Sequence, residues 1–229
     1  MKTLLFTGKA GSMNRLFSVY SALGRGQRLM AFLLFLLIAA AFPLHGDTFS
    51  FKADRMSGGK ATGREITVLT GNAEVRSDKL LLQAERIEIQ GSDNRFIDCS
   101  GNVRGFEEEK NILFRTDRLR YDRTLKIARL EGNSTLEDRK NEIVARARFI
   151  EYDDQAEVAI LQISVRLFKD NLVCRSEYSV YRRTEKTLLL SGFPVVFKKE
   201  DEFRAERIRV DLDTDDVIME GDVKGSIKN

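Results

Sequence analysis

Three short patterns in this chain resemble chemical sites, and each lacks a required part. Residues 57–60 (SGGK) and 92–94 (SDN) have the S-x-x-K and S-D-N spacing with which serine β-lactamases place a nucleophile and its proton-transfer partners. The K-T-G motif is absent, and no helix is predicted to present the serine. Residues 58–63 (GGKATG) resemble half of a phosphate-binding loop, but Arg64 and Glu65 stand where Lys and Ser or Thr are required. We interpret all three segments as turns.

An acidic segment, residues 211–222, imitates the spacing of an EF-hand loop. Asp216 occupies the sixth position, where glycine is needed, and strands are predicted on both sides, so we interpret the segment as a solvated hairpin. The only histidine, His45, lies at or before the predicted processing site. Nucleophilic catalysis therefore has no base, and we predict a protein that is not an enzyme and that needs no metal or cofactor.

The beginning of the chain is predicted to be an export segment. Residues 1–28 carry five basic residues and no acidic one, and residues 29–42 form an uncharged apolar run. This order is typical of a secretory signal, and at ~1.5 Å per residue the run spans about 21 Å, short of the ~30 Å hydrocarbon core. We expect cleavage between Ala41 and Gly46. The alternative is an inner-membrane anchor over residues 29–44, and both interpretations place the rest of the chain in the periplasm.

We divide the chain into this segment, residues 1–46, and one domain, residues 47–229. The whole chain has 38 basic and 35 acidic residues. Five of the basic residues lie before residue 29, so the domain keeps 33 basic residues against 35 acidic ones. The basic isoelectric point therefore belongs to the export segment, and we predict no binding to nucleic acid.

The domain contains two cysteines, Cys99 and Cys174, separated by 75 residues. An export compartment permits a disulfide, but this separation is not a metal-ligand spacing. We interpret both residues as apolar members of strands, since cysteine is readily buried. A disulfide between them is the alternative.

A repeat of about 30 residues is the strongest signal in the domain. Turn-like glycines occur at gaps of 30, 31, 60 and 29 residues, at Gly71, Gly101, Gly132, Gly192 and Gly221. Ser164 occupies the missing position of the double gap. A second marker, a small residue followed by polar residues, keeps the same period at Ala53, Ala84, Thr116, Ala145, Ser176 and Ala205. Two markers with one period indicate about six stacked supersecondary units that share one core.

Within each unit, apolar residues alternate with polar ones, which places the apolar side chains on one face of a β-strand. Residues 80–88 could form a helix in isolation, but their equivalents in other units carry β-branched and aromatic residues at period two, so we predict a strand. We expect the alternating apolar residues to line an elongated apolar interior. They are Leu80, Leu82, Ile87, Ile89, Phe114, Leu119, Tyr121, Ile127, Phe149, Ile160, Val195, Phe197, Ile208 and Val210.

Six units of two or three strands give about 12–16 strands. A sheet of that size must coil, close or fold onto itself, and alternation with one wet face favours antiparallel pairing. We therefore predict an all-β fold of mostly antiparallel strands. The pattern by itself leaves two architectures open, a repetitive folded β-jelly roll and a parallel β-solenoid.

The repeating unit resembles that of the OstA-like family, which includes the periplasmic lipopolysaccharide-transport protein LptA. Residues 70–89 (TGNAEVRSDKLLLQAERIEI) carry its clearest copy, a G-N-V/A turn, a short strand and then A-D/E-x-hydrophobic, and the resemblance covers residues 51–224. Ser164 and Phe193 depart from the G-N step. The resemblance implies a twisted β-jelly roll, open as a groove along one edge, that carries the acyl chains of lipopolysaccharide between membranes.

The expected function is binding and transfer of lipopolysaccharide or another glycolipid between the inner and outer membranes, without a chemical step. Other β-jelly-roll transport proteins would be partners through stacking of edge strands, and the chain could associate head to tail with itself. Two alternatives are a scaffolding β-solenoid of the envelope and an LptC-like, membrane-anchored member of the transport bridge. A carbohydrate-active β-helix enzyme is disfavoured because the catalytic groups are missing.

Overall fold

The computed structural model describes residues 50–61, 64–77 and 79–228. They belong to one compact unit, Asp47–Asn229. The predicted export segment, its cleavage site and the alternative membrane anchor lie outside the described residues. Among the residues that are described, no helix is long and apolar enough to cross a membrane.

The described residues are almost entirely strands, joined by short turns. One turn contains a short 3-10 segment, η1 (Ser92–Asn94). The first eight strands are β1 (Ser50–Lys52), β2 (Arg55–Ala61), β3 (Arg64–Arg76), β4 (Leu80–Gln90), β5 (Phe96–Glu107), β6 (Ile112–Asp122), β7 (Ile127–Asp138) and β8 (Ile143–Asp153). The remaining strands are β9 (Val158–Lys169), β10 (Leu172–Arg182), β11 (Thr187–Ser191), β12 (Val195–Lys198), β13 (Asp201–Arg204), β14 (Arg207–Asp211), β15 (Val217–Glu220) and β16 (Lys224–Ser226).

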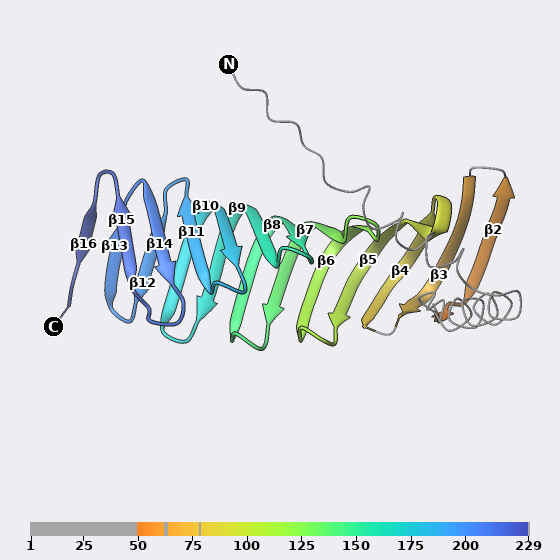
Figure 1. Cartoon of the computed structure of the whole chain (residues 1–229), viewed down its shortest axis with the longest axis horizontal. Helices are drawn as coiled ribbons and strands as arrows, with labels where there is room; N and C mark the ends of the chain where they lie inside the picture. The colour runs from red at the N-terminus through yellow and green to blue at the C-terminus, as the bar shows by residue number, and fades with distance from the viewer. Residues whose placement is uncertain (1–49, 62–63, 78, 229) are drawn as a thin grey trace, which may run out of the picture. The chain divides into compact units, whose positions relative to one another are not determined.

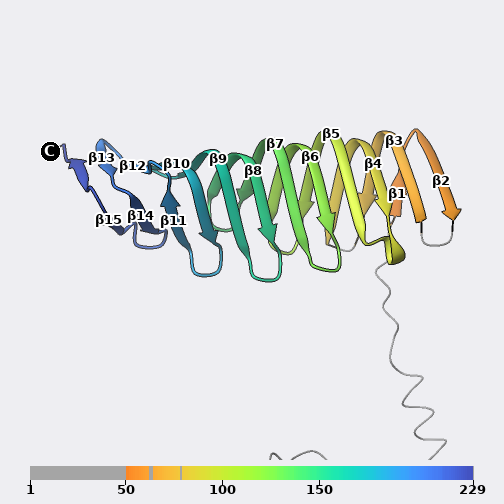
Figure 2. The ribbon, with the colours of Figure 1, turned by 90° about the horizontal axis from the view of Figure 1, so that it is seen from above.

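These strands form one antiparallel sheet in which most neighbours in sequence are neighbours in space. The order is β1-β3-β4-β5-β6-β7-β8-β9-β10-β11-β14-β15, with β2 on β3 and with β12, β13 and β16 continuing from β10. Figures 1 and 2 show the strands following one another along the long axis from β2 to β15. The predicted all-β, antiparallel fold of 12–16 strands is confirmed by this 16-stranded sheet. The alternative of a parallel solenoid is wrong for the described strands.

The long strands bend near their middles along one line, which we call the crease. There, two residues of one strand oppose one residue of the next, as between Thr70 and Ala73 on β3 and between Ser100 and Val103 on β5. Such β-bulges bend a strand. The sheet folds along the crease, so the two halves of each long strand belong to two layers whose inner faces oppose each other.

The crease explains why the two markers of the repeat share one period. Gly132 has φ 97°, a conformation that favours glycine. A Cβ on Gly132 would lie 2.2 Å from Oδ2 of Asp117 on β6. That carboxylate accepts the backbone N–H of Asn133 at 2.9 Å. The glycine of the first marker and the polar residue that follows the small residue of the second marker therefore meet at one bend.

Opposite the crease, the ends of the strands form two rows of turns. The first turn row contains the β3–β4, β5–β6, β7–β8 and β9–β10 turns, and the second contains the β4–β5, β6–β7, β8–β9 and β10–β11 turns. Most adjacent turns of a row are joined by backbone hydrogen bonds. Glu108 donates its N–H to the carbonyl of Lys79 at 2.8 Å in the first row, and Arg123 donates to Arg95 at 2.9 Å in the second.

The core lies between the two layers and is densest in the C-terminal part. Leu161, Leu167, Leu188 and Leu190 are fully buried there. Alternation of apolar and polar residues at period two places these side chains on the inner faces. The predicted apolar interior is therefore filled by the protein's own side chains beyond β8.

Two predictions about local structure are wrong. Residues 57–60 lie on β2, an edge strand paired with β3, and are not a turn, since β3 supplies a partner for their backbone. The fourth copy of the second marker is at Ala147 rather than Ala145, because the register of β8 against β9 shifts between Arg146 and Phe149. Residues 80–88 lie within strand β4, as predicted.

Candidate functional site

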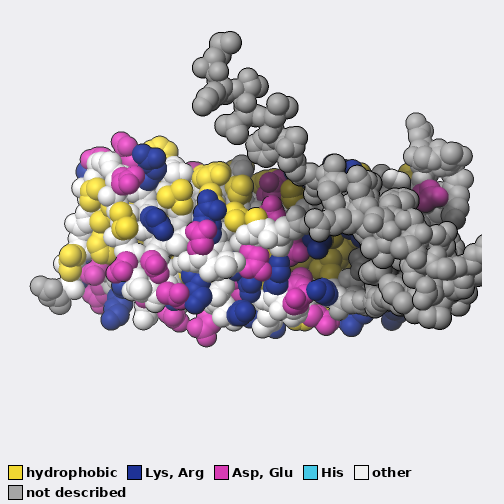
Figure 3. All heavy atoms as spheres, viewed as in Figure 1, with side chains coloured by type: hydrophobic (Ala, Val, Ile, Leu, Met, Phe, Trp, Pro, Cys, Tyr) yellow, Lys and Arg dark blue, Asp and Glu magenta, His cyan; other side chains and the backbone are white. Residues whose placement is uncertain are grey.

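A cavity of about 320 Å³ opens between the two turn rows, over strands β3 to β8. Figure 3 shows apolar side chains in a hollow over β5 and β6, with charged side chains around it. Leu82, Ile97, Leu119 and Leu130 form its buried part, and less buried apolar side chains, such as that of Phe114, form its walls. The sheet supplies these side chains because inner-face positions recur on every second residue of each strand.

Gly105 on β5 makes room for the aromatic wall. It pairs with Phe114 on β6, and a Cβ at this position would lie 1.8 Å from Cζ of the Phe114 ring. The ring therefore lies flat over the glycine. Any larger residue at position 105 would push the ring toward the cavity.

Tyr152 places a single polar atom in the apolar lining. Its side chain is 9% exposed and lines the cavity, and its hydroxyl has no hydrogen-bond partner among the described residues. Burial raises the pKa of this phenol, so the group is neutral and able to donate. A buried hydroxyl without a partner is unfavourable unless a ligand or water satisfies it.

The rim of the cavity carries both signs of charge. Lys79 and Glu107 come from the first turn row, and Lys126 and Asp154 come from the second. Lys79 is also paired with Glu109. The mouth can therefore meet a polar headgroup that bears cations, anions or hydroxyls, while the interior accepts apolar chains.

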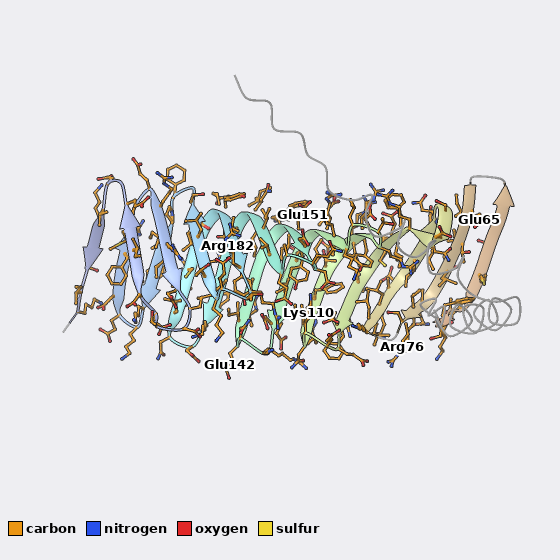
Figure 4. All side chains as sticks on the ribbon, in the orientation of Figure 1. Glu65, Arg76, Lys110, Glu142, Glu151 and Arg182 are labelled. Carbon is orange, nitrogen blue, oxygen red and sulfur yellow. The ribbon has the colours of Figure 1, made fainter. Side chains whose placement is uncertain are left out.

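Lys110 joins the two turn rows at the C-terminal end of the cavity. Its Nζ lies 2.7 Å from Oδ1 of Asp154 and 3.2 Å from Oε1 of Glu157, both on the second row. Burial alone lowers the pKa of Lys110, but these hydrogen bonds outweigh it and raise the pKa above the usual lysine value. Figure 4 places Lys110 between Arg76 and Glu142 along the molecule.

Arg183 continues this closure beyond Lys110. The guanidinium lies 2.8 Å from Asp138, a fully buried carboxylate at the end of β7, and donates to the carbonyl of Lys110 at 2.9 Å. The Tyr181 hydroxyl also donates to Asp138, at 2.9 Å. We call Lys110, Asp138, Tyr181 and Arg183 the latch. The latch holds the two turn rows together where the open cavity ends.

Comparisons with known proteins support an assignment to a family. A model of the OstA-like proteins matches residues 48–206. This chain belongs to the OstA-like family. The family suspected from the repeat is thus confirmed, and the match extends over most of the described strands.

A solved structure similar to this OstA-like chain is that of LptH, the LptA homologous periplasmic component of the conserved lipopolysaccharide transport device from Pseudomonas aeruginosa. The two chains are 11% identical, the match covers 80% of this chain and 96% of that chain, and the TM-score is 0.24. A search of curated proteins found no match. The family assignment therefore rests on the family model.

Nine of the fourteen predicted lining residues lie on the inner faces of this OstA-like sheet. Five of them border the cavity, namely Leu80, Leu82, Phe114, Leu119 and Tyr121. Ile87, Ile208 and Val210 belong to the packed core, and Ile89 packs against it. The cavity also has residues that were not predicted, such as Tyr152 and Lys126. Tyr152 lies on the inner face of β8, two residues after Ile150, and Lys126 lies in the β6–β7 turn.

The predicted inward orientation is wrong for the other five residues. Ile127, Phe149, Ile160, Val195 and Phe197 each adjoin a more deeply packed residue of the same strand and therefore lie on the outer face. For Phe149 the reason is a bulge, which shifts the phase of alternation by one residue, so that a run counted across it changes face. The other four residues do not follow a bulge within their strands, and alternation alone did not show which of the two faces is the inner one.

The remaining candidate motifs are also placed by the structure. Ser57 lies on β2, and Ser92–Asn94 form η1, so no helix presents a nucleophile. Asp211 accepts the N–H groups of Asp213 and Thr214 and thereby closes the β14–β15 turn. No group of metal-ligating side chains occurs within the described ranges. Cys99 and Cys174 are buried and unpaired, and burial raises the pKa of both thiols to about 12.

Proposed function

We propose that this chain binds the acyl chains of lipopolysaccharide or a related glycolipid in its cavity and passes the lipid between the inner and outer membranes. The proposal rests mainly on one observation, an apolar cavity with a charged rim that opens along the side of a folded sheet. No covalent step is needed, because exchange between successive sites of similar affinity is sufficient for transfer.

The size of the cavity is compatible with part of a lipid. A volume of about 320 Å³ lies at the lower end of the roughly 300–1,000 Å³ typical of ligand sites. Each methylene moved from water into this lining contributes about 0.8 kcal/mol. A segment of one or two acyl chains would therefore bind well, while the headgroup stays at the rim beside Lys79 and Lys126.

Tyr152 gives the site a means of orienting its ligand. An acyl chain is joined to its headgroup through an ester or amide, whose carbonyl oxygen accepts a hydrogen bond. The Tyr152 hydroxyl is a neutral donor without a partner in the described part of the chain. We propose that it donates to such a carbonyl when lipid is bound.

Transfer partners would attach at the ends of the sheet. β1 and β2 each pair only with β3 at one end, and β15 and β16 each have one partner at the other. Neighbouring strands alternate in direction along the order from β3 to β15. By this count β15 runs in the same direction as β3 and therefore opposite to β2. A second copy, or a related jelly roll, would continue the antiparallel pattern across the junction and lengthen the path for lipid.

We further propose a periplasmic location for residues 47–229, with residues 29–44 either removed or retained as an anchor. Envelope fractionation with a wash at high pH tests this choice. A washed membrane that retains the protein favours the anchored, LptC-like role. Release into the soluble fraction favours the LptA-like role.

Mass spectrometry of an organic extract tests lipid binding directly. The protein is purified from its native envelope, and an acylated glycolipid is expected in the extract. In the variant Ala128→Phe, a ring should fill the cavity and reduce the lipid recovered, whereas Ala156→Phe, on an exposed turn, should have no effect. An extract without any amphiphile would contradict lipid transfer and favour a scaffolding role.

A further inference from the structure

Several bends of the crease pair a Gly-Asn step on one strand with an acidic side chain beside it. The bends that depart from this arrangement are adjacent to one another. At β3, β5 and β7 the bend is formed by Gly-Asn, and the acidic side chains of Asp54, Glu85 and Asp117 lie beside the glycines. β9 instead has Ile163-Ser164, and the bend between β11 and β12 has Gly192-Phe193. On β8, Arg148 stands where the neighbouring strands carry an acid.

The strand registers place these exceptions side by side. Arg148 lies opposite Ile163 and Ser164, within the register shift between β8 and β9. Glu177 on β10 comes next and accepts the N–H of Ser164 at 3.1 Å, and the backbone N–H of Glu177 bonds to Gly192, directly before Phe193. We call this part of the crease, from β8 to β12, the ridge.

Large apolar side chains protrude from the ridge. Phe193 is 90% exposed and Ile163 is 55% exposed. Both have positive φ, 57° and 67°, which is unfavourable for bulky and especially for β-branched residues. Ile163 is about half exposed and Phe193 almost fully exposed, and neither belongs to the packed core of the described residues. Core packing therefore does not explain why apolar residues occupy these two positions.

Unpaired arginines lie beside the ridge on the outer face. Arg146 is directly opposite Arg166, which is directly opposite Arg175. Like charges in these positions destabilise a sheet. Within the described ranges, none of these three, nor Arg148, is ion-paired with a carboxylate, whereas Arg146 and Arg175 stack on Phe168 and Phe197 at 5.5 and 5.2 Å.

We propose that the ridge is a contact site for the surface of an anionic phospholipid membrane. Guanidinium groups bind phosphates through paired N–H donors, and exposed apolar side chains among basic residues are typical of segments that enter the headgroup layer. The ridge is the convex side of a bend, which suits a bilayer better than an acidic peptide, because a peptide requires a groove.

This contact would orient the molecule. The crease and the turn rows are at opposite margins of the folded sheet, so the cavity would open away from the membrane that the ridge touches. Lipid would then enter from a partner protein and not directly from that bilayer. The inference is independent of what the cavity holds.

A fluorescent probe on the ridge tests the proposal in the full chain. Ser164→Cys is labelled with an environment-sensitive dye, with Asn72→Cys on the β3 bend, about 29 Å away at ~4.8 Å per strand, as the matched control. The native Cys99 and Cys174 are buried and should not react. Vesicles contain phosphatidylcholine alone or with an equal part of phosphatidylglycerol. Binding through residues 29–44 would not favour position 164 over position 72, so a shift confined to position 164 reports on the ridge.

We expect a blue shift at position 164 with the anionic vesicles only, reduced by salt, and no shift at position 72. In Arg146→Gln/Arg166→Gln the affinity that the shift reports should fall roughly 25-fold, at about fivefold per arginine. The control Arg120→Gln/Arg129→Gln, which removes two ion-paired arginines of the other layer, should leave it unchanged. Equal shifts at both positions, equal shifts with both vesicles, or no shift would each overturn the proposal. Lipid content of the extract reports separately on the cavity.

Discussion

Tyr152 couples the stability of the empty protein to ligand binding. Its hydroxyl is buried in the cavity lining without a partner in the described residues, and such a group costs roughly 1–3 kcal/mol. The same group would be satisfied by a carbonyl of the bound lipid. A single atom therefore has opposite effects on the free and bound states.

The substitution Tyr152→Phe should separate these effects. We expect the free energy of unfolding of the lipid-free protein to rise by about 1 kcal/mol, because the unsatisfied hydroxyl is removed. Lipid affinity should fall about fivefold, through loss of one hydrogen bond. Chemical denaturation and titration with a dispersed acyl amphiphile measure the two quantities. A change in the same direction in both would contradict the role assigned to Tyr152.

A substitution of Ile163 tests whether the positive φ at the crease favours glycine. Its φ of 67° is unfavourable for a β-branched residue, by about 1–2 kcal/mol. We expect Ile163→Gly to stabilise the protein by about 1 kcal/mol, seen as a higher Tm. Gly101→Ala is the opposite control, since its Cβ would lie 2.5 Å from Oε2 of Glu85 at φ 78°, and it should lower the Tm.

Among the structural elements, the β6–β7 turn depends most clearly on charge. Arg95 donates to Oδ1 of Asp122 at 3.1 Å and to Oδ2 at 2.8 Å, and the N–H groups of Thr124 and Leu125 also donate to Oδ1. The hydrogen bonds from Arg95, which outweigh desolvation, lower the pKa of Asp122 to about 2 from 3.8. This ionised carboxylate fixes the turn at the edge of the second row.

Stability should therefore depend on pH in a defined window. A lowered pKa stabilises the fold above the unfolded value, and that contribution is lost as pH falls from about 3.8 toward about 2. In Arg95→Gln, this part of the pH dependence should be weaker. Asp122→Asn is the control, and its difference from wild type should shrink as pH approaches 2. Denaturation at several pH values measures it. An unchanged profile in Arg95→Gln would contradict the assignment.

For the molecule as a whole, the latch divides an open half from a packed half. Before it lies the cavity, and beyond it the interior is filled by leucine and isoleucine side chains. Passage of lipid through the full length would require the latch and the packed core to open. The latch thus determines how far a ligand can enter the closed form.

Breaking the latch should be costly and should loosen the turn rows. In Arg183→Met, the fully buried Asp138 loses its charged partner, which destabilises a protein by about 3–5 kcal/mol. Hydrogen exchange should rise in the β7–β8 and β10–β11 turns. The neighbouring Arg182→Met, an exposed position, should change stability by less than about 0.5 kcal/mol. Equal effects of the two substitutions would show that the closure does not depend on this ion pair.

The sequence alone determined the class of fold, the repeat and the family. Alternation at period two and glycines at a period of about 30 residues depend on local backbone preferences, which each strand and bend expresses by itself. For the same reason, Leu82, Phe114 and Leu119 were correctly placed inside.

Only the tertiary structure decided which faces remain inward beyond a bulge and where the interior stays open. Phe149 lies on the outer face because one extra residue at the crease reverses the alternation along β8. Lys110 and Arg183 join turns that are distant in the sequence, and the cavity lies between the same turn rows. Such contacts depend on how two layers close over each other. That closure is set by the packing of the whole sheet, and no single repeat contains it.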